Sequence, residues 1–185
     1  MIKIIFFIDG LRIGGKERRC IQLLKGMQSE NYEIHVVSIF RDIEYSEFYK
    51  LSLPLYIIEK KKKNEFSIHF KFYSICKQIK PDIVHSWSGL TTFYSILSKV
   101  LLKFKLINAQ ITSAPVNYKA RFINYRVYLK ALIQNQINFI FSDIVLSNSI
   151  AGLKSFNLVG KKYKVIHNGF DFDRLNDVTD TKEIR

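Results

Sequence analysis

Short apolar runs alternate with longer segments of helical periodicity along the chain. Several of the runs are continuously apolar, which is typical of strands that are buried on both faces of a parallel sheet. Because strands and helices alternate, the pattern predicts an α/β fold, a doubly wound parallel sheet of the Rossmann-like type. The predicted strands are Lys3 to Ile8, Glu33 to Ile39, Leu55 to Ile58, Asp82 to Ser86, Lys105 to Gln110, Asp143 to Leu146 and Lys164 to Ile166.

Between these strands, apolar residues recur at helical spacing and predict faces that pack inward. Three such stripes are Cys20, Leu23, Leu24 and Met27; Ile68, Phe72, Ile75 and Ile79; and Leu90, Phe93, Tyr94, Leu97 and Leu101. The longest predicted helix runs from about Tyr118 to Ile140. Its predicted inward residues are Tyr118, Phe122, Tyr125, Leu129, Leu132 and Ile133, with Lys119, Arg126 and Lys130 on another face.

The chain length of 185 residues predicts one domain with a substantial core. Residues 1–172 form this predicted domain. Residues 173–185 turn polar and are interpreted as the start of an interdomain linker or a tail, with a second domain absent. A hydrophobic content of 48% excludes a disordered chain.

From the sequence we expect no targeting segment. Asp9 and Gly10 end the first apolar run too early for a signal peptide, and no apolar window is long enough to span a membrane. Cys20 and Cys76 are interpreted as buried thiols in a reducing compartment. We therefore expect a cytoplasmic location. No cluster of Cys and His has metal-ligand spacing, so no metal site is expected.

The net charge of +13 is unevenly distributed, since no acidic residue lies between Asp82 and Asp143. Such a field favours a phosphorylated substrate, an anionic membrane surface or nucleic acid. Arginines are few and no recognition motif combines them with aromatic residues, so we expect no nucleic-acid partner. The predicted helix from Tyr118 to Ile140 could lie on an anionic membrane surface, or its basic face could simply be solvated.

A glycine-containing loop follows the first strand and precedes the first predicted helix. Gly10 and Gly15-Lys16 match most of a Walker A motif, but Glu17 replaces the Ser or Thr that binds magnesium. The spacing of the glycines also excludes a dinucleotide fingerprint. The remaining interpretations are a phosphate site, formed by backbone N–H groups of Gly14 and Gly15, or a tight turn without a ligand.

Two other segments lie where open α/β sheets bind ligands. His85 and Trp87 follow the fourth predicted strand, although a histidine there can be structural and the tryptophan can either stack on a sugar or belong to the core. Asn148 and Ser149 follow the sixth strand and resemble a helix N-cap first and a ligand contact second. The cations Lys16, Arg18 and Arg19 lie at the positive end of a helix, which is favourable only near an anion; otherwise they are solvated surface residues.

Four sequence strings, in this order, carry a family resemblance. They are Gly-Gly-Lys-Glu-Arg-Arg near the start, Lys80-Pro-Asp-Ile-Val-His-Ser-Trp87, Leu146-Ser-Asn-Ser149 and Val165-Ile-His-Asn-Gly-Phe-Asp171. Together they resemble the N-terminal half of the GT-B glycosyltransferases of family 4, over nearly all of residues 1–176.

The resemblance implies a two-domain enzyme that moves a sugar from a nucleotide-sugar donor with retention of configuration and without a required metal or cofactor. It implies that this half holds the acceptor, while the other half binds the nucleotide. The donor phosphate would contact Gly14, Gly15 and Lys16. The acceptor would contact His85, Ser86, Trp87, Gln110 and Thr112.

The chain departs from the family pattern in two respects. The nucleotide-binding domain is missing, and the segment from Asn108 to Pro115 lacks the His or Arg that many members place there. Thr112 can hydrogen-bond a hydroxyl but cannot replace a cation or a base. We therefore assign no catalytic residue and expect this chain to be inactive alone.

The leading hypothesis is the acceptor-side domain of a hexosyltransferase-type enzyme of surface polysaccharide synthesis. Its partners would be a nucleotide sugar with a missing domain or second chain, a glycan or lipid-linked acceptor, and the inner face of the cell membrane. The alternative is a non-catalytic Rossmann-like module that recruits a partner to the membrane.

Overall fold

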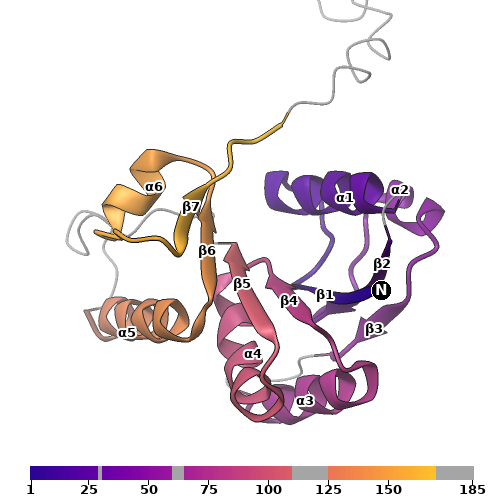
Figure 1. Cartoon of the computed structure of the whole chain (residues 1–185), viewed down its shortest axis with the longest axis horizontal. Coiled ribbons are helices and arrows are strands. Elements are labelled where there is room, and N and C mark those ends of the chain that lie inside the picture. The colour runs from indigo at the N-terminus through magenta and orange to yellow at the C-terminus, as the bar shows by residue number, and fades with distance from the viewer. Residues whose placement is uncertain (29–30, 60–64, 110–124, 170–185) are drawn as a thin grey trace, which may run out of the picture.

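A parallel sheet of seven strands forms the centre of the protein, in the order β3-β2-β1-β4-β5-β6-β7 (Figure 1). The structure is a computed structural model and describes residues 1–28, 31–59, 65–109 and 125–169. The predicted doubly wound sheet is confirmed, and each predicted strand lies within about a residue of an observed one. The strands are β1 (Ile2–Ile8), β2 (Tyr32–Ser38), β3 (Leu55–Ile57), β4 (Ile83–Ser86), β5 (Lys105–Ala109), β6 (Ile144–Ser147) and β7 (Tyr163–Val165).

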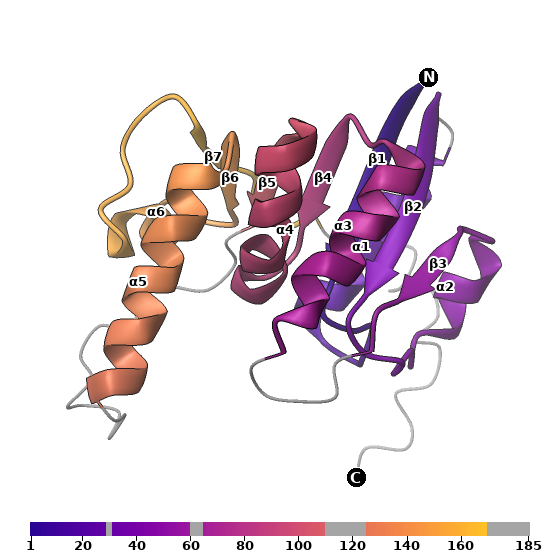
Figure 2. The same cartoon turned by 90° about the horizontal axis from the view of Figure 1, so that it is seen from below.

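Helices cover both faces of the sheet, with α1 and α6 on one face and α3, α4 and α5 on the other (Figures 1 and 2). Alternate residues of β1 therefore enter two separate cores: Phe6 packs with Cys20 and Leu24 of α1, whereas Phe7 stacks on Phe72 of α3. The helices are α1 (Gly15–Met27), α2 (Ser46–Lys50), α3 (Ser67–Ile79), α4 (Gly89–Leu102), α5 (Tyr125–Phe141) and α6 (Ile150–Ser155). Cys20 and Cys76 are free and buried, as predicted.

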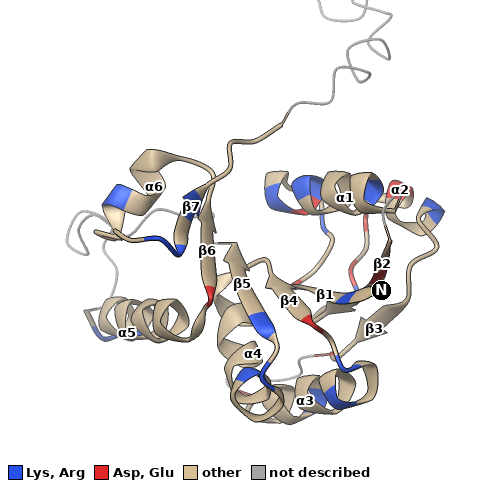
Figure 3. Ribbon diagram, in the orientation of Figure 1, with Lys and Arg blue, Asp and Glu red and all other residues tan. Residues whose placement is uncertain are grey.

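Acidic residues mark the amino ends of β4 and β6 (Figure 3). Asp82 accepts a hydrogen bond from the backbone N–H of Lys3 at 2.8 Å, and Asp143 accepts one from the N–H of Leu106 at 2.7 Å. Asp143 also pairs with the ammonium group of Lys99. These carboxylates are structural, and they lie at the edge opposite to the one where parallel α/β sheets bind ligands.

Helix α4 packs on the sheet through small polar residues, so part of its predicted inward face is wrong. Thr92 and Ser95 are fully buried, whereas Leu101 is 56% exposed. The buried hydroxyl groups have backbone partners on the preceding turn: Thr92 Oγ1 donates to the carbonyl of Ser88 at 2.9 Å, and Ser95 Oγ donates to that of Thr91 at 2.8 Å. Because these bonds remove the cost of burial, the helix can approach the sheet closely.

Helix α5 leaves most of its predicted inward face exposed, which corrects the prediction. Tyr125, Leu129 and Ile133 are 56%, 41% and 52% exposed, and the residues that α5 buries are Asn138 and Phe139 near its end. Tyr118 and Phe122 lie outside the described residues. In α1, Leu23 belongs to the stripe predicted to pack inward, but it is also exposed. Within the described ranges, no helix is both long enough and apolar enough to cross a bilayer.

Candidate functional site

The glycine loop is held in place by the segment that follows β2. The backbone N–H of Gly14 donates to Tyr45 Oη at 3.1 Å, and the same hydroxyl donates to the carbonyl of Gly14 at 3.0 Å. One residue earlier, the N–H of Ile13 donates to a carboxylate oxygen of Glu44 at 2.9 Å. The loop is therefore anchored before any ligand arrives.

Helix α1 begins directly after this loop with an uncapped N-terminus. Gly14 is the N-cap residue, it provides no side-chain cap, and the first helical bond runs from the N–H of Arg18 to its carbonyl at 3.1 Å. A Cβ atom added to Gly15 would meet no atom within 4 Å. The space beside Gly15 is thus open, as a phosphate site requires, whereas a carboxylate oxygen of Glu17 lies over Gly14.

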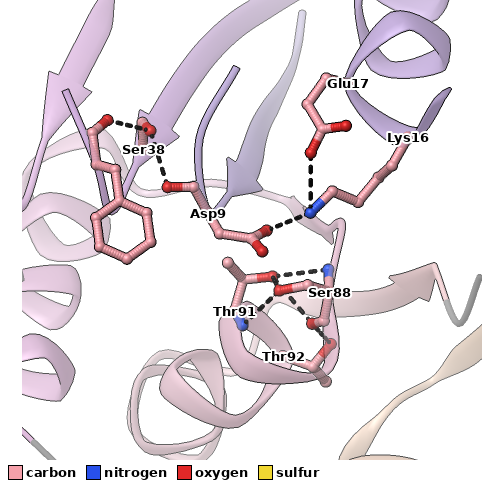
Figure 4. Close-up of polar contacts among 8 residues, drawn as sticks. Asp9, Lys16, Glu17, Ser38, Ser88, Thr91 and Thr92 are labelled. Atoms are coloured by element: carbon pink, nitrogen blue, oxygen red, sulfur yellow. Dashed lines mark hydrogen bonds and ion pairs between the residues drawn. The ribbon is translucent and has the colours of Figure 1, made fainter. Parts of the chain in front are cut away.

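Lys16 already has two acidic partners within the protein (Figure 4). Its Nζ lies 2.8 Å from Asp9 Oδ1 and 3.2 Å from Glu17 Oε1. Burial lowers the pKa of Lys16, but the two carboxylates outweigh it and the net pKa is raised. A donor phosphate would have to compete with Asp9 and Glu17 for this ammonium group, so the predicted phosphate contact of Lys16 stays a prediction.

A small pocket lies at the carboxyl ends of β4, β5 and β6. Its volume is about 110 Å³. Arg19 and Leu23 of α1 form one wall, and residues after β6 and β7 form another. Apart from these two residues of α1, the pocket is lined by His85, Trp87, Ala109, Leu146, Ser147, Asn148 and Ile166.

Three nitrogen atoms of this pocket are buried without a hydrogen-bond partner. They are Arg19 Nη1, His85 Nε2 and Trp87 Nε1. His85 and Trp87 are 7% and 3% exposed, and they share one face of the sheet because they are two positions apart. Their ring centroids are 4.9 Å apart, and both rings pack on Phe6. The ring of Trp87 therefore belongs to the core, and Trp87 is also one of the residues that line the pocket.

His85 is held in its neutral form at pH 7. Burial, and to a lesser extent the charge of Arg19, lowers its pKa to about 4. Burial also lowers the pKa of Arg19. A neutral imidazole can either donate or accept through Nε2, depending on its tautomer.

The structure gathers only part of the predicted acceptor site. Ser86 points to the opposite face, where its hydroxyl lies 2.7 Å from Thr92 Oγ1 and donates to the carbonyl of Ile107 at 3.0 Å, so it does not reach the pocket. Gln110 and Thr112 lie outside the described residues. Ser149 caps α6 by accepting from the N–H of Gly152 at 3.0 Å.

Two pocket residues carried a weaker sequence signal. Asn148 precedes the cap of α6 and lines the pocket. The sequence indicates that Arg19 is either a solvated cation or a neighbour of an anion, and the structure places it in the lining of the same pocket as His85. Its position one helical turn after Gly15 was the available signal.

A second cavity of about 370 Å³ lies between α3, α4 and α5, on the other face of the sheet. Phe66 and Phe93 contribute to its largely apolar wall, and Ile133 reaches it from α5. His69 is buried among the aromatic rings, with Nδ1 unpartnered, and burial lowers its pKa. The polar residues that line this cavity include Glu65, Lys130 and Gln134.

Comparison with known proteins identifies the family to which this chain belongs. The model of Glycosyltransferase Family 4 matches residues 13–174. The chain belongs to glycosyltransferase family 4. Its sheet and flanking helices are those of an N-terminal GT-B domain, so the resemblance carried by the four sequence strings is confirmed.

Among proteins similar to this family 4 chain, the capsular polysaccharide biosynthesis glycosyltransferase CapH of Staphylococcus aureus is 30% identical over 185 residues, covering 95% of this chain and 49% of CapH. The crystal structure of HepE from Anabaena with UDP-glucose superposes with a TM-score of 0.73 at 16% identity, covering 94% of this chain and 45% of HepE. MurG of Acinetobacter baumannii gives a TM-score of 0.66 at 15% identity, covering 92% and 46%. The chain thus spans about half the length of these relatives.

Proposed function

We propose that this chain is the acceptor-side domain of a hexosyltransferase-type enzyme that transfers a sugar from a nucleotide sugar to a glycan or lipid-linked acceptor in surface polysaccharide synthesis. Membership of family 4 supports a glycosyl transfer. The relative CapH is described as an enzyme of capsular polysaccharide biosynthesis, and HepE was solved with UDP-glucose. These descriptions support a polysaccharide product and a nucleotide-sugar donor.

The observation that carries the proposal is that α1 contributes to two ligand-binding features. Its uncapped first turn, at Gly14 and Gly15, offers N–H groups to a phosphate. Its next turn places Arg19 in the pocket that holds His85 and Trp87. A donor phosphate at the helix start and an acceptor in the pocket would therefore lie within about one helical turn of each other.

This arrangement would bind and position the substrates. The N–H groups of the first turn of α1 would stabilise negative charge on the leaving phosphate. Among the described residues that line the pocket, none is a carboxylate that could act as a base. The nucleotide-binding half, as a further domain or a second chain, would supply the rest of the site.

A transfer assay with the nucleotide-binding half present tests the proposal. The complete protein should bind UDP-hexoses and release UDP, whereas residues 1–185 alone should release no UDP at a measurable rate. Gly15→Val should abolish UDP release because its side chain would fill the open space at the helix start. Gly26→Val, at the other end of α1, provides the matched control. A complete protein that neither binds nor hydrolyses any nucleotide sugar would overturn the proposal.

The second candidate function, a module that recruits a partner to the membrane, is favoured by the exposed apolar side of α5. Leu129 and Ile140 are 41% and 69% exposed on this side of the helix, and Ile133 extends the apolar surface to the large cavity. Such a helix can insert its apolar side chains between anionic lipids.

Co-sedimentation with vesicles of phosphatidylglycerol or phosphatidylcholine separates this candidate from the first. Membrane recruitment predicts binding to the anionic vesicles that Ile133→Glu weakens. Val159→Glu, a change at a residue that is 90% exposed between α6 and β7, should have no effect. Vesicle binding in a complete protein without nucleotide-sugar turnover would favour the module, and equal sedimentation of all three proteins would refute it.

A further inference from the structure

Three residues that line the small pocket at the ends of β4, β5 and β6 each have a buried nitrogen atom without a hydrogen-bond partner. We propose that it is an oxyanion site, in which Arg19, His85 and Trp87 hold a carboxylate or phosphate group of a substrate. The identity of that substrate rests on the proposed glycosyl transfer, but the binding of the anion is measurable without it.

The unpartnered atoms require a ligand that accepts hydrogen bonds. The nitrogen atoms of Arg and Trp side chains can only donate, and His85 Nε2 can donate in one tautomer. Buried polar groups in folded proteins nearly always have partners, so exceptions that converge on one cavity need an explanation. Arg19 Nη1, His85 Nε2 and Trp87 Nε1 all lack a partner here. An oxygen-rich group in the pocket would satisfy all three.

The charge of the pocket favours an anion over a neutral sugar hydroxyl. Lys16 pairs with Asp9, and the guanidinium of Arg18 lies 5.7 Å from the ring centroid of Tyr45. Arg19, in contrast, forms no ion pair with any described residue, and no described residue lining the pocket is acidic. A hydroxyl would pair with Trp87 but leave this half-buried guanidinium without a counter-charge.

The size of the pocket indicates how much of the ligand enters. A volume of about 110 Å³ accommodates a single carboxylate or phosphate group. It is well below the roughly 300 Å³ at which pockets for whole small molecules begin. The anionic group would therefore be a substituent, and the rest of the substrate would lie outside the pocket.

Two substrates could supply such a group. An acidic acceptor, such as a uronic acid or a phosphorylated saccharide, would place its anion here from the acceptor side. The donor could also supply its diphosphate, because the first turn of α1 lies one turn before Arg19. The same chemistry is recognised in both cases, and the experiment below distinguishes them.

The indole N–H of Trp87 is a reporter for the pocket, because Trp87 lines it. Its resonance is unambiguous, because the chain contains one tryptophan. In ¹⁵N-labelled chain, this proton gives a single indole resonance. We expect it to shift on titration with glucuronate or inorganic phosphate and to remain in place with glucose. Equal shifts with glucose and glucuronate, or no shift with either anion, would overturn the proposal.

Matched variants identify the cation responsible. Arg19→Gln should weaken anion binding by about tenfold or more, since it removes the charged partner. Arg18→Gln removes the same charge from the adjacent position and should leave binding within about twofold. Arg19→Lys should retain part of the affinity, which shows that the loss in Arg19→Gln is not a folding defect. An equal loss in Arg18→Gln and Arg19→Gln would mean that only the overall field matters, and would refute the site.

Titration with UDP identifies the source of the anion. If UDP shifts the indole resonance and its presence prevents the shift that glucuronate otherwise causes, the pocket holds the donor phosphate. If glucuronate acts and UDP does not, the group belongs to the acceptor. Because this experiment involves no turnover, anion binding can succeed in a protein that transfers no sugar, and the two proposals can fail separately.

Discussion

Protonation of His85 should couple the stability of this domain to pH. Burial and the neighbouring Arg19 hold the pKa of His85 at about 4 in the folded chain, against about 6.5 for an exposed histidine. Arg19 is the charged group facing it, and the rings of Phe6 and Trp87 provide no acceptor for an added proton. Between pH 6.5 and 4 the unfolded chain binds a proton that the folded chain does not, so the free energy of unfolding falls as the pH falls.

The magnitude of this effect follows from the two pKa values. Single-site linkage between about 6.5 and about 4 gives a loss of about 2 kcal/mol from pH 7 to pH 5, and about 3 kcal/mol by pH 4. In a domain of this length, a change of about 2 kcal/mol lowers the melting temperature by roughly 4–8 °C. His69 acts in the same direction, because burial lowers its pKa as well.

Urea denaturation at pH 7, 6 and 5, followed by circular dichroism, measures this loss. We compare the wild-type chain with His85→Gln and His69→Gln, and with the double variant. The His85→Gln chain should lose about 2 kcal/mol less than the wild type between pH 7 and pH 5. The double variant should show almost no pH dependence in this window, since carboxylates titrate mainly below it.

If the free energy of unfolding of His85→Gln falls with pH as steeply as that of the wild type, the reasoning is refuted. This result would mean that the imidazole is protonated in the folded chain, and therefore that solvent or an acceptor reaches Nε2. Glucuronate or phosphate in the buffer provides a further check: an anion bound beside His85 should stabilise the imidazolium and flatten the slope of the wild type but not that of His85→Gln.

Three further changes test other parts of the structure. Ser88→Ala removes the side chain that accepts from the N–H of Thr91 at the start of α4, and should lower the free energy of unfolding by about 1 kcal/mol in urea denaturation. Gly15→Ala should leave that free energy within about 0.5 kcal/mol but weaken UDP binding by the complete protein, whereas Gly26→Ala should raise it by about 0.5–1 kcal/mol and leave UDP binding unchanged. Burial raises the pKa of Asp143, but its hydrogen bonds lower it overall, so its stabilisation is present above its unfolded pKa of 3.8 and is lost below it. Asp143→Asn should therefore destabilise the chain by about 1–3 kcal/mol at pH 7, with the difference shrinking as the pH falls below 3.8.

The strands could be predicted from sequence because a strand of a parallel sheet is apolar on both faces. The run around Phe6 and Phe7 has no polar position, so it fits no surface element. The faces of α4 and α5 were harder to predict, because periodicity identifies an apolar stripe but not what it packs against. In α4 the small hydroxyl residue Thr92 packs against β4 while Leu101 is exposed, and in α5 the stripe containing Leu129 is largely exposed.

Sequence order located the candidate site only partly. His85 and Trp87 were recognisable because they end a buried strand, where ligands of open sheets bind. Ser86 lies between them, and strand alternation turns it toward Thr92 on the other face. Arg19 was not assigned to the site, because its entry into the pocket depends on the rotation of α1 over the sheet, which no local pattern encodes.

The central position of β1 has a consequence for the chain while it is still being synthesised. The backbone N–H of Lys3 in β1 donates to the carboxylate of Asp82, which lies 79 positions later in the chain. Strand β4, which pairs with β1, is synthesised directly after Asp82. At about 5–20 residues per second, ribosomes need roughly 4–16 s to add that stretch. During this interval the edge of β1 that later pairs with β4 has unpaired backbone groups. Because the sequence from Ile4 to Ile8 is wholly apolar, this edge can pair with other nascent chains. The soluble yield of this protein should therefore depend on how β1 is shielded before residue 82 leaves the ribosome.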